Sequence, residues 1–137
     1  MEKYSRIKAL ISLDAIRYNF EQMKKNIKEG TKIIAVIKAD AYGHGAVPIA
    51  RMLEEFDYIW GFAAATAQEA LQLRKAGITR PILILGLVFE EYYKKLAEND
   101  VRMAVCDYET ARKFNKAAEA AGKKGLIPHG CGSGMTR

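Results

Sequence analysis

Short apolar runs alternate with amphipathic segments along most of this chain, and no other feature restricts its fold as strongly. Such runs are typical of strands covered on both faces, and they occupy residues 32–39, 58–64, 81–86 and 101–106. Segments with apolar residues at helical spacing follow them, at 45–56, 66–77, 90–100 and 107–122. A fifth strand is expected to begin near Leu126. Alternation at roughly 20 to 25 residues predicts an α/β fold of successive βα units around a parallel sheet.

Two α/β architectures contain such units, an open doubly wound sheet and a (β/α)8 barrel of the TIM type. A closed barrel typically needs about 250 residues. This chain has 137 residues, enough for four to five βα units. On the barrel interpretation it is a partial barrel, which would expose strand edges and apolar surface. We therefore expect the chain alone to be unstable or to self-associate.

Two of the predicted helices carry clear end signals. Thr66, followed three residues later by Glu69, forms a capping box ahead of an amphipathic segment, and Gly77 is suited to end that helix. Asp107 and Gly122 have the same positions at the two ends of the last helix.

The first residues do not follow the repeating pattern. Ile7–Leu13 alternates imperfectly between apolar and polar residues, which indicates an edge or antiparallel strand. Beyond it, apolar residues share one helical face, namely Ile16, Phe20, Met23 and Ile27. We expect an N-terminal strand segment over residues 1–13 and an incomplete barrel domain over residues 14–137.

Charge and composition argue against several classes of protein. Lys and Arg number 22 against 16 Asp and Glu, a net charge of +6, but they are spread along the predicted helices. A nucleic-acid surface would cluster them among aromatic residues, so no nucleic-acid partner is predicted. A basic balance still favours an anionic ligand such as a phosphate ester.

The sequence carries no sign of a membrane, secretory or metal-binding protein. No apolar run reaches the ~18 residues of a membrane span. Charges interrupt the N-terminal segment throughout, so we expect no secretory leader and a cytoplasmic protein. Cys106 and Cys131 match no zinc-binding spacing, so no metal site is predicted.

The stretch "AVIKADAYGHGA", residues 35–46, places Lys38 at the end of a strand that reads as buried. Burying a lysine as an ion costs several kcal/mol, so either its amine reaches solvent or its burial serves a function. An amine withdrawn from water loses its proton more readily and can then attack a carbonyl carbon. Because function gathers at the carboxyl ends of strands in α/β folds, Lys38 is a candidate nucleophile and base.

The loop after Lys38 strengthens this interpretation. Gly43 and Gly45 permit tight turns and a close approach to a ligand. Tyr42 offers a rigid hydroxyl that can bind a phosphate. His44 could act as a base, but a hydrogen-bonding strut is the favoured role for a single histidine in a loop.

The same stretch resembles the pyridoxal 5′-phosphate (PLP) attachment motif of bacterial alanine racemases. "ISLDAIRYNF" is similar to the opening strand and helix of that family, and "FAAATAQEALQLRKAGITRPILILG" to its second and third barrel units. The closing "GMTR" resembles its next motif. The resemblance extends over nearly the whole chain.

This resemblance implies a PLP-dependent isomerase that interconverts L-alanine and D-alanine for peptidoglycan precursors. Lys38 would attach the cofactor covalently, and Tyr42 would bind its phosphate. Arg137 matches an arginine near the phenolic oxygen of PLP and the carboxylate of the substrate. Two bases would act on opposite faces of the amino acid. Lys38 would serve one face, and a tyrosine from the C-terminal domain of the partner subunit in a homodimer would serve the other.

Part of the family pattern has no counterpart in these 137 residues. In the family the barrel continues with a histidine and an arginine around the pyridine ring, and a β-rich C-terminal domain carries the second base. We therefore expect negligible racemase activity from this chain alone.

The stretch "LIPHGCGSGMTR" also departs from the family pattern. The family has a lysine and an aspartate where this chain has Gly130 and Gly132. With Gly134 these glycines weaken a strand, so a disordered tail is the favoured interpretation.

Two other functions stay open on the sequence. The first is a PLP-dependent racemase that acts on serine or on a basic amino acid. The second is a PLP-binding protein without turnover, which would need only the partial barrel and Lys38.

Overall fold

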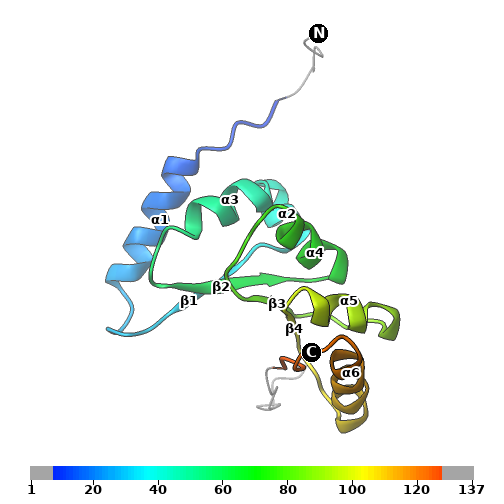
Figure 1. The fold of residues 1–137 in the computed structure, drawn as a ribbon. Coiled ribbons are helices and arrows are strands. Elements are labelled where there is room, and N and C mark those ends of the chain that lie inside the picture. The colour runs from blue at the N-terminus through cyan, green and yellow to red at the C-terminus, as the bar shows by residue number, and fades with distance from the viewer. Residues whose placement is uncertain (1–7, 128–137) are drawn as a thin grey trace.

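Four parallel strands form the centre of the molecule (Figure 1). The computed structural model describes residues 8–127. The strands lie in the order β1-β2-β3-β4, and each pairs in parallel with its neighbours along the chain. Their bounds are Ile33–Val36 for β1, Ile59–Ala64 for β2, Ile82–Ile84 for β3 and Val101–Met103 for β4. The predicted α/β fold with a parallel sheet is confirmed.

Helices connect successive strands and give the chain its βα repeat. The helices after β1 are α2, Lys38–Gly43, and α3, Ala46–Leu53, and the helix after β2 is α4, Ala67–Lys75. The short helices η1, Glu90–Tyr92, and α5, Tyr93–Glu98, join β3 to β4, and α6, Tyr108–Ala120, follows β4. Figure 1 shows α3 and α4 over one side of β1 and β2. Within residues 8–127, no helix is both long and apolar enough to cross a bilayer.

The strand order decides between the two architectures. A doubly wound sheet reverses its strand order at a switch point and carries helices on both faces, whereas a barrel adds each strand beside the previous one. Here the order is sequential. Residues Ile34 and Val36 of β1 are 42% and 44% exposed, although their neighbour Ala35 is buried. An apolar sheet face open to solvent is the geometry of a partial barrel, and it differs from the coverage on both faces that the apolar runs predicted.

The core lies between the sheet and its helices. Two rows of side chains cross β2, β3 and β4 in register, each at most 1% exposed: Phe62, Ile82 and Val101, then Ala64, Ile84 and Met103. Helix residues such as Leu53, Leu73 and Leu96 pack into the same cluster. Each of the larger side chains here, Val, Leu, Ile, Phe or Met, stabilises the fold by about 1.5–3 kcal/mol relative to its exposed state.

The predicted helix ends are confirmed. The Thr66 hydroxyl accepts a hydrogen bond from the Glu69 N–H at 3.2 Å, and the Glu69 carboxylate accepts one from the Thr66 N–H at 3.3 Å. Gly77, just past the end of α4, has a φ of 88°, and Gly122, just past the end of α6, has a φ of 67°. These left-handed conformations favour glycine, which has no Cβ.

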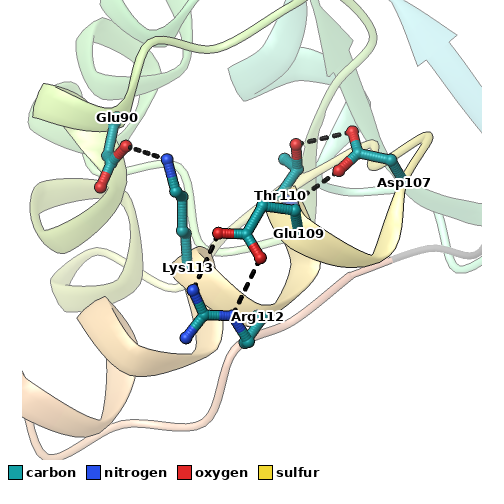
Figure 2. A network of polar contacts seen from close by, with 6 residues as sticks. All are labelled: Glu90, Asp107, Glu109, Thr110, Arg112 and Lys113. Carbon is teal, nitrogen blue, oxygen red and sulfur yellow. Dashed lines mark hydrogen bonds and ion pairs between the residues drawn. The ribbon is translucent and has the colours of Figure 1, made fainter.

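Helix α6 begins at a network of polar contacts (Figure 2). The Asp107 carboxylate accepts hydrogen bonds from the Thr110 N–H and hydroxyl, both at 2.7 Å, and these bonds lower the pKa of Asp107 below its ordinary value. Figure 2 also shows Lys113 extending to Glu90 of η1, at 2.9 Å. Exposed ion pairs of this kind contribute little, so the cap at Asp107 contributes more to helix stability.

The strand predicted over Ile7–Leu13 is not present where the structure describes this segment. Residues 8–12 have no regular structure, Leu10 is 92% exposed, and Leu13 begins helix α1, Leu13–Lys25. The Ser12 hydroxyl caps this helix by accepting the Ala15 N–H at 3.1 Å. A strand needs a neighbour for its backbone groups, and no described strand pairs with this segment, so the cap determines the local structure.

Two further expectations differ in part from the structure. Ile16 and Phe20 of α1 pack against the core as predicted, but Met23 is 48% exposed. Leu126 and Ile127 are not in a strand, and the rest of the predicted fifth strand lies outside the described residues.

Glu54 and Arg80 join the end of α3 to the start of β3. The Glu54 carboxylate accepts the N–H groups of Thr79 and Arg80 at 2.7 and 2.9 Å. The Arg80 guanidinium donates in return to the carbonyl oxygens of Glu54, Phe56 and Ile59, at 2.7 Å for Phe56. These bonds pair backbone groups in the turns that precede β2 and β3 and at Ile59, the first residue of β2.

The hydrogen bonds to Glu54 should make the stability of the chain depend on pH. Burial by itself would raise the pKa of Glu54, but the N–H groups of Arg80 and Thr79 outweigh it and hold the pKa below the ordinary 4.5. The unfolded chain therefore binds the proton more tightly than the folded chain. The stability from Glu54 is present above pH 4.5 and is lost as the pH falls through the lowered pKa.

We expect Glu54→Gln to be less stable than the parent chain near neutral pH, by about 1–3 kcal/mol for a charged hydrogen-bond acceptor. The difference should shrink when urea unfolding is measured at successively lower pH, because the parent carboxyl takes up its proton as the pH falls through its lowered pKa. Glu55→Gln is the matched control, because Glu55 is exposed and, within residues 8–127, its carboxylate contacts only Arg17, in a surface ion pair. A gap between Glu54→Gln and the parent that is constant with pH would contradict this account.

Candidate active site

Lys38 lies at the carboxyl end of β1, as the sequence predicts. The Ile37 N–H still bonds the carbonyl oxygen of Ala63 in β2, at 2.9 Å, so the strand ladder reaches Ile37. Lys38 is the next residue, and its side chain is half-buried. The amine is therefore attached to a backbone position that the sheet fixes, at the edge where α/β proteins place their sites.

The segment labelled α2 is a left-handed turn that follows Lys38 directly. Ala39, Asp40, Ala41 and Tyr42 have φ values of 50°, 52°, 53° and 55°, with ψ between 38° and 47°. Left-handed conformations cost non-glycine residues about 1–2 kcal/mol each. Four in succession persist only where the surrounding structure holds them, and such strain is concentrated at functional sites. The sequence predicted a loop here but not its handedness.

Backbone contacts close this turn onto the start of α3. The Ala41 N–H bonds the carbonyl oxygen of Ile37 at 2.9 Å, and the Gly45 N–H bonds that of Asp40 at 2.9 Å. The Asp40 carboxylate accepts the Ala46 N–H at 2.8 Å. Asp40 thus connects the turn to the first residue of α3.

His44 stabilises the same turn. Its Nδ1 lies 2.9 Å from the carbonyl oxygen of Ala41, and because a carbonyl can only accept, Nδ1 carries the proton. This contact confirms the strut that the sequence analysis favoured for His44. Gly43 and Gly45, with φ values of 85° and 92°, confirm the need for glycine on either side of it.

Glu69 reaches the turn from the neighbouring βα unit. Its Oε1 accepts the Ala39 N–H at 2.9 Å, and its Oε2 accepts the Ala65 N–H at 2.7 Å. The sequence identified Glu69 only as a helix-capping residue. The contact with Ala39 joins residues 30 positions apart, so no local pattern could reveal it.

The structure describes Tyr42, the residue predicted to bind a phosphate, but not Arg137, the residue predicted to bind the substrate. Tyr42 lies in the left-handed turn with a side chain 61% exposed, so its hydroxyl is open to a ligand. Arg137 lies outside the described residues, as do Gly130, Gly132 and Gly134. The site described here therefore consists of Lys38, Tyr42 and the residues that hold their turn.

The residue types at this strand end suit a ligand that carries two chemical groups. Lys38 supplies an amine, which can attack a carbonyl carbon, and the exposed Tyr42 supplies a phenol, which can donate to an anionic group such as a phosphate. Within residues 8–127, no group of three or more His, Cys, Asp or Glu side chains could hold a metal ion.

Comparison with known proteins places this geometry in a family. Residues 11–137 match the family model described as "Alanine racemase, N-terminal domain". Alanine racemase 1 of Oceanobacillus iheyensis is 41% identical over 129 residues, which are 93% of this chain and 34% of that protein. The chain thus spans about a third of the length of the curated relatives it matches.

Solved structures agree with the sequence match. Alanine racemase of Clostridium difficile 630 superposes with a TM-score of 0.82 at 42% identity, over 85% of this chain and 31% of that one. A histidine racemase from Leuconostoc mesenteroides superposes with a TM-score of 0.73 at 29% identity, over 85% of this chain and 31% of that one. The expected fold, a partial barrel of the alanine racemase N-terminal type, is confirmed.

The family match covers both the strand end that carries Lys38 and the turn that follows it. The chain therefore belongs to the alanine racemase family, and residues 11–137 correspond to its N-terminal domain.

Proposed function

We propose that this chain forms the PLP-binding part of an alanine racemase that interconverts L-alanine and D-alanine. The observation that supports this most is the position of Lys38, half-buried at the carboxyl end of β1 and followed by a strained left-handed turn. A lysine that merely reached solvent would need no such turn. The family match supports the reaction class.

The residues present fit PLP, which carries an aldehyde and a phosphate on one pyridine ring. Lys38 would hold the aldehyde carbon through its Nζ, and the exposed Tyr42 hydroxyl would donate to the phosphate. The net charge of +6 favours an anionic cofactor. When bound, PLP supplies an electron sink that stabilises the charge left on an amino acid after its α-proton is removed.

Lys38 then has a second role as a base. Its Nζ, when it is not bound to the cofactor, would remove or return the α-proton on one face of the amino acid. Racemisation needs a second base on the opposite face. We propose that this base is a tyrosine from the C-terminal domain of a partner subunit, which makes the active protein a homodimer. Arg137 would contact the substrate carboxylate.

The biological setting is part of the same proposal. We propose a cytoplasmic enzyme whose D-alanine supplies peptidoglycan precursors. It rests on the resemblance of the Lys38 motif to bacterial alanine racemases.

One observation favours a second candidate, a racemase for a basic amino acid. The Leuconostoc protein with a TM-score of 0.73 is named a histidine racemase, so a similar partial barrel occurs with that activity. Serine, or PLP binding without turnover, would place the same demands on Lys38 and Tyr42. The substrate must therefore be assigned by comparing alanine, serine and histidine on one preparation.

The proposed role of Lys38 predicts where PLP attaches. The chain is mixed with PLP and reduced with borohydride, and the modified peptides are mapped by mass spectrometry. We expect Lys38 to be labelled in preference to Lys75, an exposed lysine at the end of α4. Lys38→Arg, which keeps the charge, should lose this labelling and leave Lys75 unchanged. Equal labelling of both lysines, or none, would contradict the proposal.

The need for a second base predicts little turnover. With PLP, the 137-residue chain should racemise alanine no faster than free PLP does, because these residues supply only the proposed base Lys38. The measurement is the gain of D-alanine from L-alanine, followed by chiral chromatography, with Lys38→Arg as control. Alanine racemisation that is well above free PLP and depends on Lys38 would show that one base suffices.

A further inference from the structure

We infer that Glu69 is the positioning residue for Lys38, because its carboxylate holds the left-handed turn against the neighbouring strand end. Glu69 contacts no reacting atom in this account and acts through the backbone of Ala39. The inference rests on the proposed function of Lys38 and adds to it the residue that keeps the amine in place.

The Glu69 carboxylate bridges two neighbouring strand ends. Oε1 accepts the N–H of Ala39, the residue directly after Lys38 and the first of the left-handed turn. Oε2 accepts the N–H of Ala65, directly after β2. Since β1 and β2 pair in parallel, with Val36 opposite Ala63, these two N–H groups lie at the same edge of the sheet. One carboxylate therefore ties the catalytic turn to the adjacent strand.

The carboxylate is itself held in place. Glu69 lies in the first turn of α4, where its N–H donates to the Thr66 hydroxyl and its Oε2 also accepts the Thr66 N–H. A glutamate in a capping box ordinarily serves only the N-terminus of its own helix. Here the other carboxylate oxygen, Oε1, accepts the N–H of Ala39, which lies 30 residues away. The capping box thus fixes the position of an acceptor that the other βα unit uses.

The left-handed turn depends on the Glu69 carboxylate, because the N–H that it accepts belongs to Ala39, the first residue of the turn. Ala39 has a φ of 50°, and three more left-handed residues follow it. A hydrogen bond to an ionised carboxylate is stronger than one to a neutral oxygen. Without it the Ala39 N–H loses its partner, and the turn can relax toward conformations that alanine prefers. The side chains of Lys38 and Tyr42 would then lose their fixed directions.

Glu69→Gln tests this inference, with Thr66→Ala as the matched control. Glutamine keeps the size of the side chain but has one acceptor oxygen, so it cannot serve both Ala39 and Ala65. Thr66→Ala removes the other half of the capping box and leaves both carboxylate oxygens. The first readout is hydrogen exchange of the Ala39 amide without cofactor. The Phe62 amide, which donates to the carbonyl oxygen of Pro81 at 2.9 Å, reports whether the variant is folded.

The second readout is the preference of borohydride-trapped PLP for Lys38 over Lys75. In Glu69→Gln we expect Ala39 to exchange about tenfold faster, as for loss of a hydrogen bond to a charged group, and the preference for Lys38 to fall. In Thr66→Ala both should stay within about twofold of the parent, since the bond to Ala39 remains. Phe62 should stay protected in both variants.

Two results would overturn the role of Glu69. One is that Glu69→Gln keeps the Ala39 exchange rate and the Lys38 labelling of the parent. The other is that Thr66→Ala loses Ala39 protection and Lys38 preference as much as Glu69→Gln does, which would mean that both depend on the general stability of α4. If Phe62 protection shows that Glu69→Gln unfolds, Glu69→Asp replaces it, because a carboxylate one methylene shorter cannot span both N–H groups. A parent chain that shows no preference for Lys38 contradicts the proposed function instead, and Ala39 exchange then decides the role of Glu69 separately.

Discussion

The site depends on a run of backbone strain and on the hydrogen bonds that hold it. Four non-glycine residues, Ala39–Tyr42, adopt left-handed conformations that alanine, aspartate and tyrosine disfavour. Glu69 ties the start of this turn to the end of β2, Asp40 ties its second residue to α3, and His44 contacts its third residue, Ala41. These contacts involve α3 and, from the next βα unit, α4, so the turn forms only when the first two βα units are packed together.

The two ends of the sheet use polar side chains for different purposes. At the amino end, Glu54 and Arg80 pair backbone groups in the turns that enter β2 and β3. At the carboxyl end, Glu69 and Asp40 hold a turn that carries an exposed tyrosine and a half-buried lysine. The first arrangement stabilises the fold. The second keeps strain where a ligand would bind, as expected of a barrel whose sites lie at its carboxyl face.

Sequence patterns predicted the fold well where local chemistry determines the structure. The βα repeat, the capping box at Thr66 and the glycines after α4 and α6 each follow from a few neighbouring residues. The strand over Ile7–Leu13 was wrong where it can be checked, because a strand needs a partner that local alternation cannot supply.

The candidate site was only partly predictable for the same reason. Lys38 and Tyr42 were proposed from residue type and from the resemblance of their motif, and the structure adds where they lie. The handedness of their turn was missed, since its residues run against their own preferences and only tertiary contacts enforce it. The bond from Glu69 to Ala39 was missed because it joins separate βα units.

The measurement that tests this account most directly is the backbone geometry of Ala39–Tyr42 in solution. Three-bond couplings and chemical shifts from NMR on the 137-residue chain report φ at each of these positions. We expect a positive φ of about 50° at all four residues. Negative φ at Ala39 and Asp40 in a folded chain would mean that Lys38 is not held by a left-handed turn, and the account of the site would be wrong.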